Sequence, residues 1–293
     1  MEEFLKYIPL DKSWINRMGM LDMLHGYDDI VRFLEKQQDL GDDLLALKRV
    51  AEKWNTEEPL NVGESGTLYR FVRFSLWKKQ EDRKIIKEGS LLTRDLCDNP
   101  EIINWPLQKL LDSNLDGGTT QWVSAAIING NTERIKIPKG KEEKINLSYE
   151  AREHYKQRKE GKCWIPRYDK TIERQARVYI GLLKKNDLDF TPKHSEDYCF
   201  ARAFNIISQS EGEYNWPQLK NHESNRIKEM EDSIKEAEKY QKISSKDHRV
   251  IQAIVMLQSY LGKKVHVEHP CSVKKSWSLF WEFMDYCNRI KAG

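Results

Sequence analysis

Apolar residues recur every three or four positions over several stretches of the chain, and this spacing predicts amphipathic helices. Ser13 is placed to cap the first helix, Asp28 and Asp29 to open the second, and Asp247 to cap a later one. Two further helices are expected over residues 250–261 and 277–289. The apolar positions that define the other helices are Ile15, Met18, Leu21 and Leu24; Ile30, Phe33 and Leu34; Leu68, Phe71 and Val72; Val123, Ala125, Ala126 and Ile127; and Met230, Ile234 and Ala237. Helix is therefore expected to be prominent.

Two short segments have the pattern of strands. Residues 60–62 precede a glycine-rich turn at residues 63–67 and then a helix, and residues 264–267 alternate between polar and apolar side chains. Because strand, glycine turn and helix in succession are typical of α/β proteins, we predict the α/β or α+β class. Residues 141–174 are charged and aromatic with weak periodicity, and neither an element nor a role is assigned to them.

Composition and charge exclude several classes of protein. The chain has 293 residues, of which 39% are hydrophobic, and this is enough for one large domain or two ordinary ones. The longest apolar run, residues 122–128, is far shorter than a bilayer span, so no membrane segment is expected. The net charge of +3 gives no global attraction for nucleic acid, and anion binding must come from local clusters.

The cysteines and the first residues predict a cytoplasmic protein. The five cysteines are widely spread and contain no C-x-x-C pair, so neither a disulfide framework nor a zinc site is expected. The opening residues, 1–4 (MEEF), lack the basic and apolar regions of a secretory signal.

Four motifs place a polar or cationic group beside the start of a predicted helix, where backbone amides and the helix dipole attract anions. They are Lys12-Ser13 with Arg17, residues 63–67 (GESGT) with Arg70, Thr119-Thr120-Gln121, and Asp247-His248-Arg249. The glycine loop is neither a phosphate-binding P-loop nor a nucleophile elbow. For each motif, ordinary helix capping or an ordinary strand-to-helix turn is the alternative interpretation.

Taken in order, these pieces resemble the motifs of the enolpyruvyl transferases, and most closely those of the shikimate-pathway branch. Residues 12–17 (KSWINR) are similar to that family's K-S-x-x-N-R, and residues 63–70 (GESGTLYR) to its G-[NE]-[AS]-G-T-x-x-R. Further islands in the same order are Asp28-Asp29, residues 89–94 (GSLLTR), Thr119-Thr120-Gln121, Tyr168, Asp197, residues 223–226 (ESNR), Asp247-His248-Arg249 and Lys275-Ser276. The resemblance spans nearly the whole chain.

The resemblance implies a two-domain fold of repeated βαβαββ units, with one unit missing between Tyr168 and Asp197. The first domain is then residues 13–185, and the second, shortened domain is residues 1–12 together with 186–293. The chain departs from the family pattern at three positions: Glu196, His222 and Asn225 stand where the family has proline, lysine and aspartate.

The resemblance also implies an activity, the transfer of the enolpyruvyl group of phosphoenolpyruvate to the 5-hydroxyl of shikimate 3-phosphate by addition and elimination. The enzyme is expected to be a monomer that needs no cofactor or metal and binds neither nucleic acid nor a membrane. Proton transfer and charge stabilisation fall to Lys12, Asp197 and Glu223. Phosphoenolpyruvate would bind Lys12, Gly66, Arg94, Gln121, Arg226, Arg249 and Lys275. Shikimate 3-phosphate would bind Ser13, Arg17, Thr119, Thr120, Gln121, Tyr168 and Asp197.

Two other functions remain open. A non-catalytic descendant would bind an anionic metabolite or a protein partner, and the missing unit favours it, as does His222, which is a cation only when protonated. An RNA-binding protein would stack bases on Tyr149, Tyr155, Trp164 and Tyr168, between basic residues. Interspersed acidic residues and the small net charge disfavour RNA.

Overall fold

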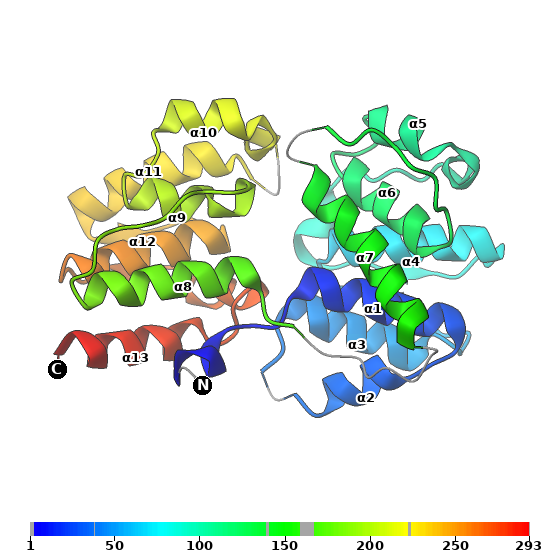
Figure 1. Cartoon of the computed structure of the whole chain (residues 1–293), viewed down its shortest axis with the longest axis horizontal. Helices are drawn as coiled ribbons and strands as arrows, with labels where there is room; N and C mark the ends of the chain where they lie inside the picture. Colours follow the sequence, from blue (N-terminus) through cyan, green and yellow to red (C-terminus); the bar gives the residue numbers. More distant parts are fainter. Residues whose placement is uncertain (1–2, 38, 139–140, 159–166, 222–223, 293) are drawn as a thin grey trace. The chain divides into compact units, whose positions relative to one another are not determined.

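Helices dominate the computed structural model, which is 63% helix and 4% strand (Figure 1). It describes residues 3–37, 39–138, 141–158, 167–221 and 224–292. The α-helices are α1 (Lys12–His25), α2 (Asp29–Glu35), α3 (Asp42–Lys53), α4 (Gly66–Lys79), α5 (Leu107–Asp112), α6 (Thr119–Ile128), α7 (Glu142–Arg158), α8 (Lys170–Leu183), α9 (Tyr198–Ala203), α10 (Gln209–Asn215), α11 (Arg226–Tyr240), α12 (His248–Tyr260) and α13 (Phe280–Ala292). The strands are β1 (Leu60–Asn61), β2 (Ile85–Ile86), β3 (Lys242–Ile243) and β4 (His266–Val267).

The predicted α/β fold of repeated βαβαββ units is wrong. Among the described residues there are only two sheets, each a parallel pair of two-residue strands, β1 with β2 and β3 with β4. Such short pairs have few ladder hydrogen bonds, so they cannot organise a domain by themselves. The predicted strand and glycine turn are present at residues 60–65, but they connect α3 to α4 within a helical unit and do not open a series of α/β repeats.

The chain divides into two compact units. The N-terminal unit is Leu10–Arg167, and the C-terminal unit combines Met1–Pro9 with Tyr168–Gly293. Helix α8 lies within residues 13–185, the predicted first domain, but it packs against α12 and α13 and so belongs to the C-terminal unit.

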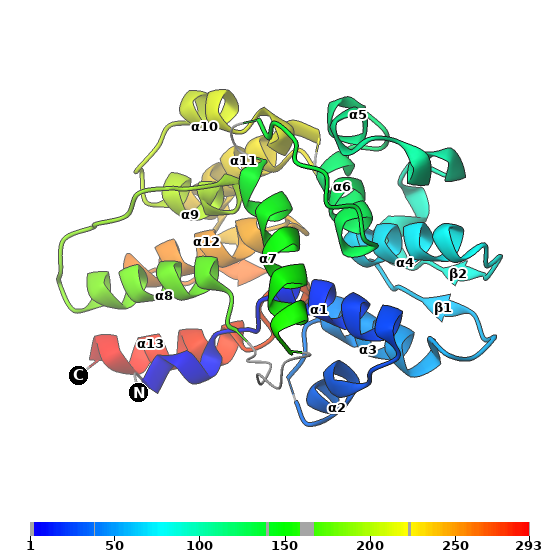
Figure 2. The same ribbon diagram turned by 45° about the vertical axis from the view of Figure 1, so that its right-hand side comes forward.

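The N-terminal unit is built on α1, which packs against α3 and α7, while α6 packs against α4 and α7. Asp11 caps α1 by accepting a hydrogen bond from the amide of Trp14, so the cap lies two residues before the predicted Ser13. Gly26, with a φ of 74°, ends this helix in the left-handed conformation that glycine adopts without strain. Trp77 and Trp122 stack in the core, and Figure 2 shows β1 and β2 beneath α4 at the edge of the unit.

The C-terminal unit surrounds α12, which packs against α8, α9, α11 and α13. Asp247 caps α12, as predicted, and its apolar residues Val250, Ile251 and Ile254 are fully buried. The predicted inner face of α11 is confirmed at Met230, which is also fully buried. In the part of the chain that the structure describes, no helix is both long and apolar enough to cross a bilayer.

Candidate anion-binding site

All four motifs do begin helices. Lys12 starts α1, Gly66 starts α4, Thr119 starts α6, and His248 starts α12. The candidate site residues fall into two groups, one in each unit. The N-terminal unit holds Lys12, Ser13, Arg17, Gly66, Arg94, Thr119, Thr120 and Gln121, and the C-terminal unit holds Tyr168, Asp197, Arg226, Arg249 and Lys275. Glu223 and His222 lie outside the described residues.

Arg17 joins helices of the N-terminal unit. Its side chain is 2% exposed and packs over the ring of Phe71. The guanidinium donates to the hydroxyl of Ser148 at 2.7 Å, the hydroxyl of Ser124 at 3.0 Å, and the carbonyl of Lys144 at 2.9 Å. Since Ser124 is on α6 and Ser148 on α7, these bonds hold α1 against both helices.

Lys12 and Ser13 are also engaged inside this unit. The ammonium of Lys12 forms an ion pair of 2.7 Å with Asp43 on α3. The hydroxyl of Ser13 accepts a hydrogen bond of 3.3 Å from the ammonium of Lys144. Both contacts are made by part-buried side chains, so α1, α3 and α7 are linked through this end of α1.

Arg70 is the centre of a buried cluster that brings together the glycine loop and the Thr-Thr-Gln motif. Its guanidinium pairs with Asp116 at 3.1 Å, donates to the carbonyl of Gly66 at 2.9 Å, and contacts the amide oxygen of Gln121. The backbone must come very close here, because a Cβ on Gly118 would lie 2.1 Å from the guanidinium carbon. Two predicted residues, Gly66 and Gln121, are therefore neighbours of one arginine.

Asp116 belongs to the Arg70 cluster but to none of the four sequence motifs. Its side chain is fully buried, and it accepts hydrogen bonds from the amide of Gly118 at 2.9 Å, the amide of Cys97 at 3.1 Å and the indole of Trp122 at 3.0 Å. An aspartate directly before two glycines and a helix start was the available signal. With these donors and Arg70, the carboxylate fixes the loop before α6.

The other predicted residues of this unit lie around the Arg70 cluster. Arg94 donates to the hydroxyl of Ser90 at 3.1 Å. It also lies close to Gly66, because a Cβ added to that glycine would be 3.1 Å from Nη1 of Arg94. Thr119 is buried, and its hydroxyl donates to the carbonyl of Ser113 at 2.9 Å, while Thr120 is half-buried.

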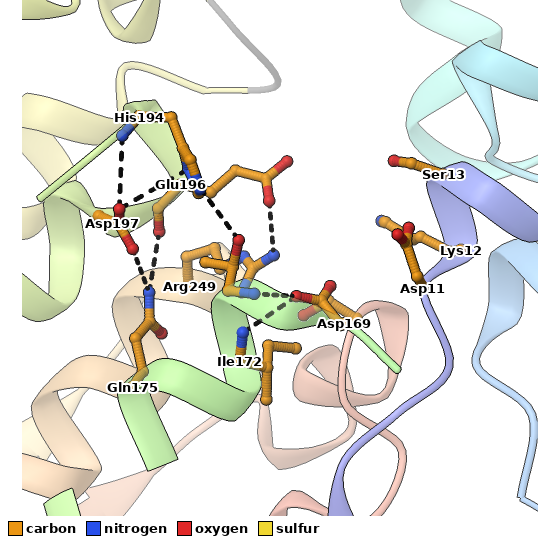
Figure 3. Close-up of polar contacts among 12 residues, drawn as sticks. Asp11, Lys12, Ser13, Asp169, Ile172, Gln175, His194, Glu196, Asp197 and Arg249 are labelled. Atoms are coloured by element: carbon orange, nitrogen blue, oxygen red, sulfur yellow. Dashed lines mark hydrogen bonds and ion pairs between the residues drawn. The ribbon is translucent and has the colours of Figure 1, made fainter. Parts of the chain in front are cut away.

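Asp197 lies in the short 3₁₀ helix η4 (Ser195–Asp197) of the C-terminal unit, with its side chain fully buried. It accepts hydrogen bonds from the side-chain amide of Gln175 at 3.2 Å and from the backbone amide of His194 at 3.4 Å (Figure 3). It also pairs with Arg174 and accepts a hydrogen bond of 2.8 Å from the backbone amide of Lys193. The carboxylate therefore ties η4 to α8, which carries Arg174 and Gln175.

Arg226 and Asp247 form a buried ion pair of 2.8 Å at the N-termini of α11 and α12. The second oxygen of Asp247 accepts a hydrogen bond of 2.9 Å from the amide of Arg249 and thus caps α12. The hydroxyl of Ser224 also donates to Asp247, at 3.3 Å. One carboxylate therefore joins the two helix starts and positions Arg249 in the first turn of α12.

Arg249 carries the strongest binding signal. Its side chain is 5% exposed, and its Nη2 donates to Glu196 at 3.3 Å (Figure 3). Its Nη1 is buried and has no hydrogen-bond partner among the described residues. A buried charged donor without an acceptor is costly, whereas a guanidinium with free donors binds carboxylates and phosphates through two parallel hydrogen bonds. The dipole of α12 favours an anion at the same place.

The remaining candidates lie in less enclosed surroundings. Tyr168 is exposed, and Lys275 is half-buried at the end of the 3₁₀ helix η6 (Pro270–Lys275), which packs against α12. Cys199, two residues after Asp197, is buried, and burial raises the pKa of its thiol to about 12, so it is neutral at physiological pH. No group of three or more potential metal ligands occurs in the described parts of the chain.

Comparisons with protein-family models, curated proteins and solved structures found no match to this chain. The resemblance to the enolpyruvyl transferases therefore depends on short motifs alone, and membership of that family stays a prediction.

Proposed function

We propose that this protein binds a small anionic metabolite through a carboxylate or phosphate group at Arg249. The unpartnered, buried Nη1 at the start of α12 carries the proposal. Charge-assisted hydrogen bonds of this kind are short and strong, and a planar group with two oxygens matches the two terminal nitrogens of arginine.

The surroundings support this assignment in two ways. Asp247, the nearest carboxylate on the same helix, is already engaged by Arg226, so the negative charge beside the site is compensated. The backbone amide of Arg249 donates a hydrogen bond to Asp247 in the cap of α12, so the backbone that carries the guanidinium is fixed. A ligand then meets a positioned donor instead of a flexible surface side chain.

Replacing Arg249 with glutamine is expected to weaken binding of phosphoenolpyruvate or inorganic phosphate about 10- to 100-fold, since a hydrogen bond to a charged group contributes roughly 1.5–3 kcal/mol. Isothermal titration calorimetry measures this change. R249K, which keeps the charge but loses the planar fork, is expected to lie between the native protein and R249Q.

The matched control is R177Q, because Arg177 belongs to the same unit but lies on the exposed face of α8, paired with Glu173. It removes the same charge and is expected to leave the affinity nearly unchanged. Equal affinity of R249Q and the native protein, with both folded by circular dichroism, would contradict the proposal.

Enolpyruvyl transfer to shikimate 3-phosphate is a second candidate, favoured by one observation. The four motifs that resemble the transferase pattern all begin helices, at Lys12, Gly66, Thr119 and His248, where amides and dipole attract anions. The residues that the structure describes do not form the repeated α/β units on which that activity would depend, so we rank this candidate below simple binding.

The transferase candidate predicts release of inorganic phosphate when the protein is mixed with phosphoenolpyruvate and shikimate 3-phosphate. It also predicts that each substrate tightens binding of the other, whereas a binding protein responds to a single ligand. A colorimetric phosphate assay and paired calorimetric titrations measure the two effects. No phosphate release over hours at micromolar protein would eliminate the transferase and leave the binding proposal in place.

A further inference from the structure

Glu196 occupies one side of the Arg249 guanidinium. Its Oε2 accepts a hydrogen bond of 3.3 Å from Nη2 and leaves Nη1 unused (Figure 3). The two partners differ in exposure, because the side chain of Glu196 is 28% exposed and that of Arg249 is 5% exposed. The carboxylate thus reaches the guanidinium from the solvent side of the pair.

The backbone of Glu196 is held in place, whereas its side chain is partly exposed. The carbonyl of Glu196 accepts a hydrogen bond of 3.4 Å from the side-chain amide of Gln175. The next residue, Asp197, is fully buried and fixed by Arg174 and Gln175. A long, partly exposed side chain can change rotamer while the backbone that carries it stays fixed.

We infer that Glu196 is a built-in competitor that occupies the anion position on Arg249 until a ligand displaces it. This inference rests on the proposed function, since it concerns the same site. In the unliganded protein, the carboxylate compensates a buried charge that would otherwise be costly. When a ligand binds, its own oxygens take over that compensation and Glu196 turns towards solvent.

The competition also selects the ligand. Glu196 accepts a hydrogen bond from Nη2 of Arg249 but not from Nη1, so a group that offers two oxygens to Nη1 and Nη2 gains an additional bond in the exchange. Carboxylates and phosphates have this geometry, whereas halides do not. Because Glu196 is tethered beside the site, it competes at a high effective concentration, and only such two-oxygen anions displace it efficiently.

Calorimetric titration of E196Q with phosphoenolpyruvate and with inorganic phosphate tests this inference. E196Q is expected to bind both probes about tenfold more tightly than the native protein, because a partly buried charge pair no longer has to be broken. E196D keeps the negative charge but shortens the side chain by one methylene, so it is expected to bind more tightly than the native protein as well. The double variant E196Q/R249Q is expected to lose the gain.

E173Q is the charge-matched control, because Glu173 lies on α8 of the same unit and pairs with Arg177 instead of Arg249. It is expected to bind the probes as the native protein does. Equal gains in E196Q and E173Q would overturn the inference, since net charge alone would then explain them. Binding by the native protein with no gain in E196Q would overturn the inference but leave the proposed function intact. No binding by either protein would overturn both.

Discussion

Replacing Asp116 with alanine is expected to lower the free energy of unfolding of the N-terminal unit by about 3–5 kcal/mol, the cost of removing one partner from a buried ion pair. The Arg70 side chain is 5% exposed and would lose its carboxylate partner. The amides of Cys97 and Gly118 and the indole of Trp122 would lose their acceptor at the same time. Urea unfolding followed by circular dichroism measures the change in stability.

The matched control for Asp116 is D98A. Asp98 is an exposed carboxylate of the same unit that pairs with Arg73, and removal of an exposed pair costs about 0–1 kcal/mol. Hydrogen exchange locates the effect, since D116A is expected to reduce protection within residues 10–167 more than D98A does. If D116A and D98A were equally stable, the Arg70 cluster would not be the structural centre that its contacts indicate.

Replacing Asp247 with alanine is expected to destabilise the C-terminal unit by a similar amount, about 3–5 kcal/mol, because it removes the partner of the buried Arg226 and the cap of α12 together. D247N separates the two contributions. Its side-chain oxygen can still accept the amide of Arg249, so only the charge is lost, and its stability is expected to lie between D247A and the native protein. The same urea unfolding experiment gives this order.

Two results would contradict this account of Asp247. A loss below about 1 kcal/mol in D247A would mean that the ion pair and the cap contribute no more than an ordinary surface contact. Equal losses in D247N and D247A would mean that the cap of α12 contributes nothing beyond the charge.

The sequence predicted local features of the fold well, because capping and periodicity are local properties. Asp247 was expected to cap a helix and does, and α2 begins at Asp29 as expected. Helix α4 begins at Gly66, inside the turn that was expected to precede it. The pattern could not show that residues 60–66 would be followed by one two-residue strand, β2, and otherwise by helices, since a single strand and turn carry no information on the rest of the sheet. The fold class was wrong for that reason.

The site was harder to predict, because ion pairs between distant residues leave no periodic signal. Arg70, Gln121 and Arg249 were expected to meet anions, but their protein partners were not foreseen. Asp116 lies 46 residues from Arg70, and Glu196 lies 53 residues from Arg249. Only the folded chain shows that the guanidinium groups of Arg70 and Arg249 already form ion pairs with Asp116 and Glu196.

The order in which the chain supplies its two units has a consequence for synthesis. The N-terminal unit is an insertion between Pro9 and Tyr168, so it is contiguous and can fold as soon as it leaves the ribosome. The segment before it cannot, because the carbonyl of Tyr7 accepts a hydrogen bond of 2.7 Å from the indole of Trp277, near the other end of the chain. Tyr7 is therefore translated before the N-terminal unit but reaches this native contact only after Trp277 has been made.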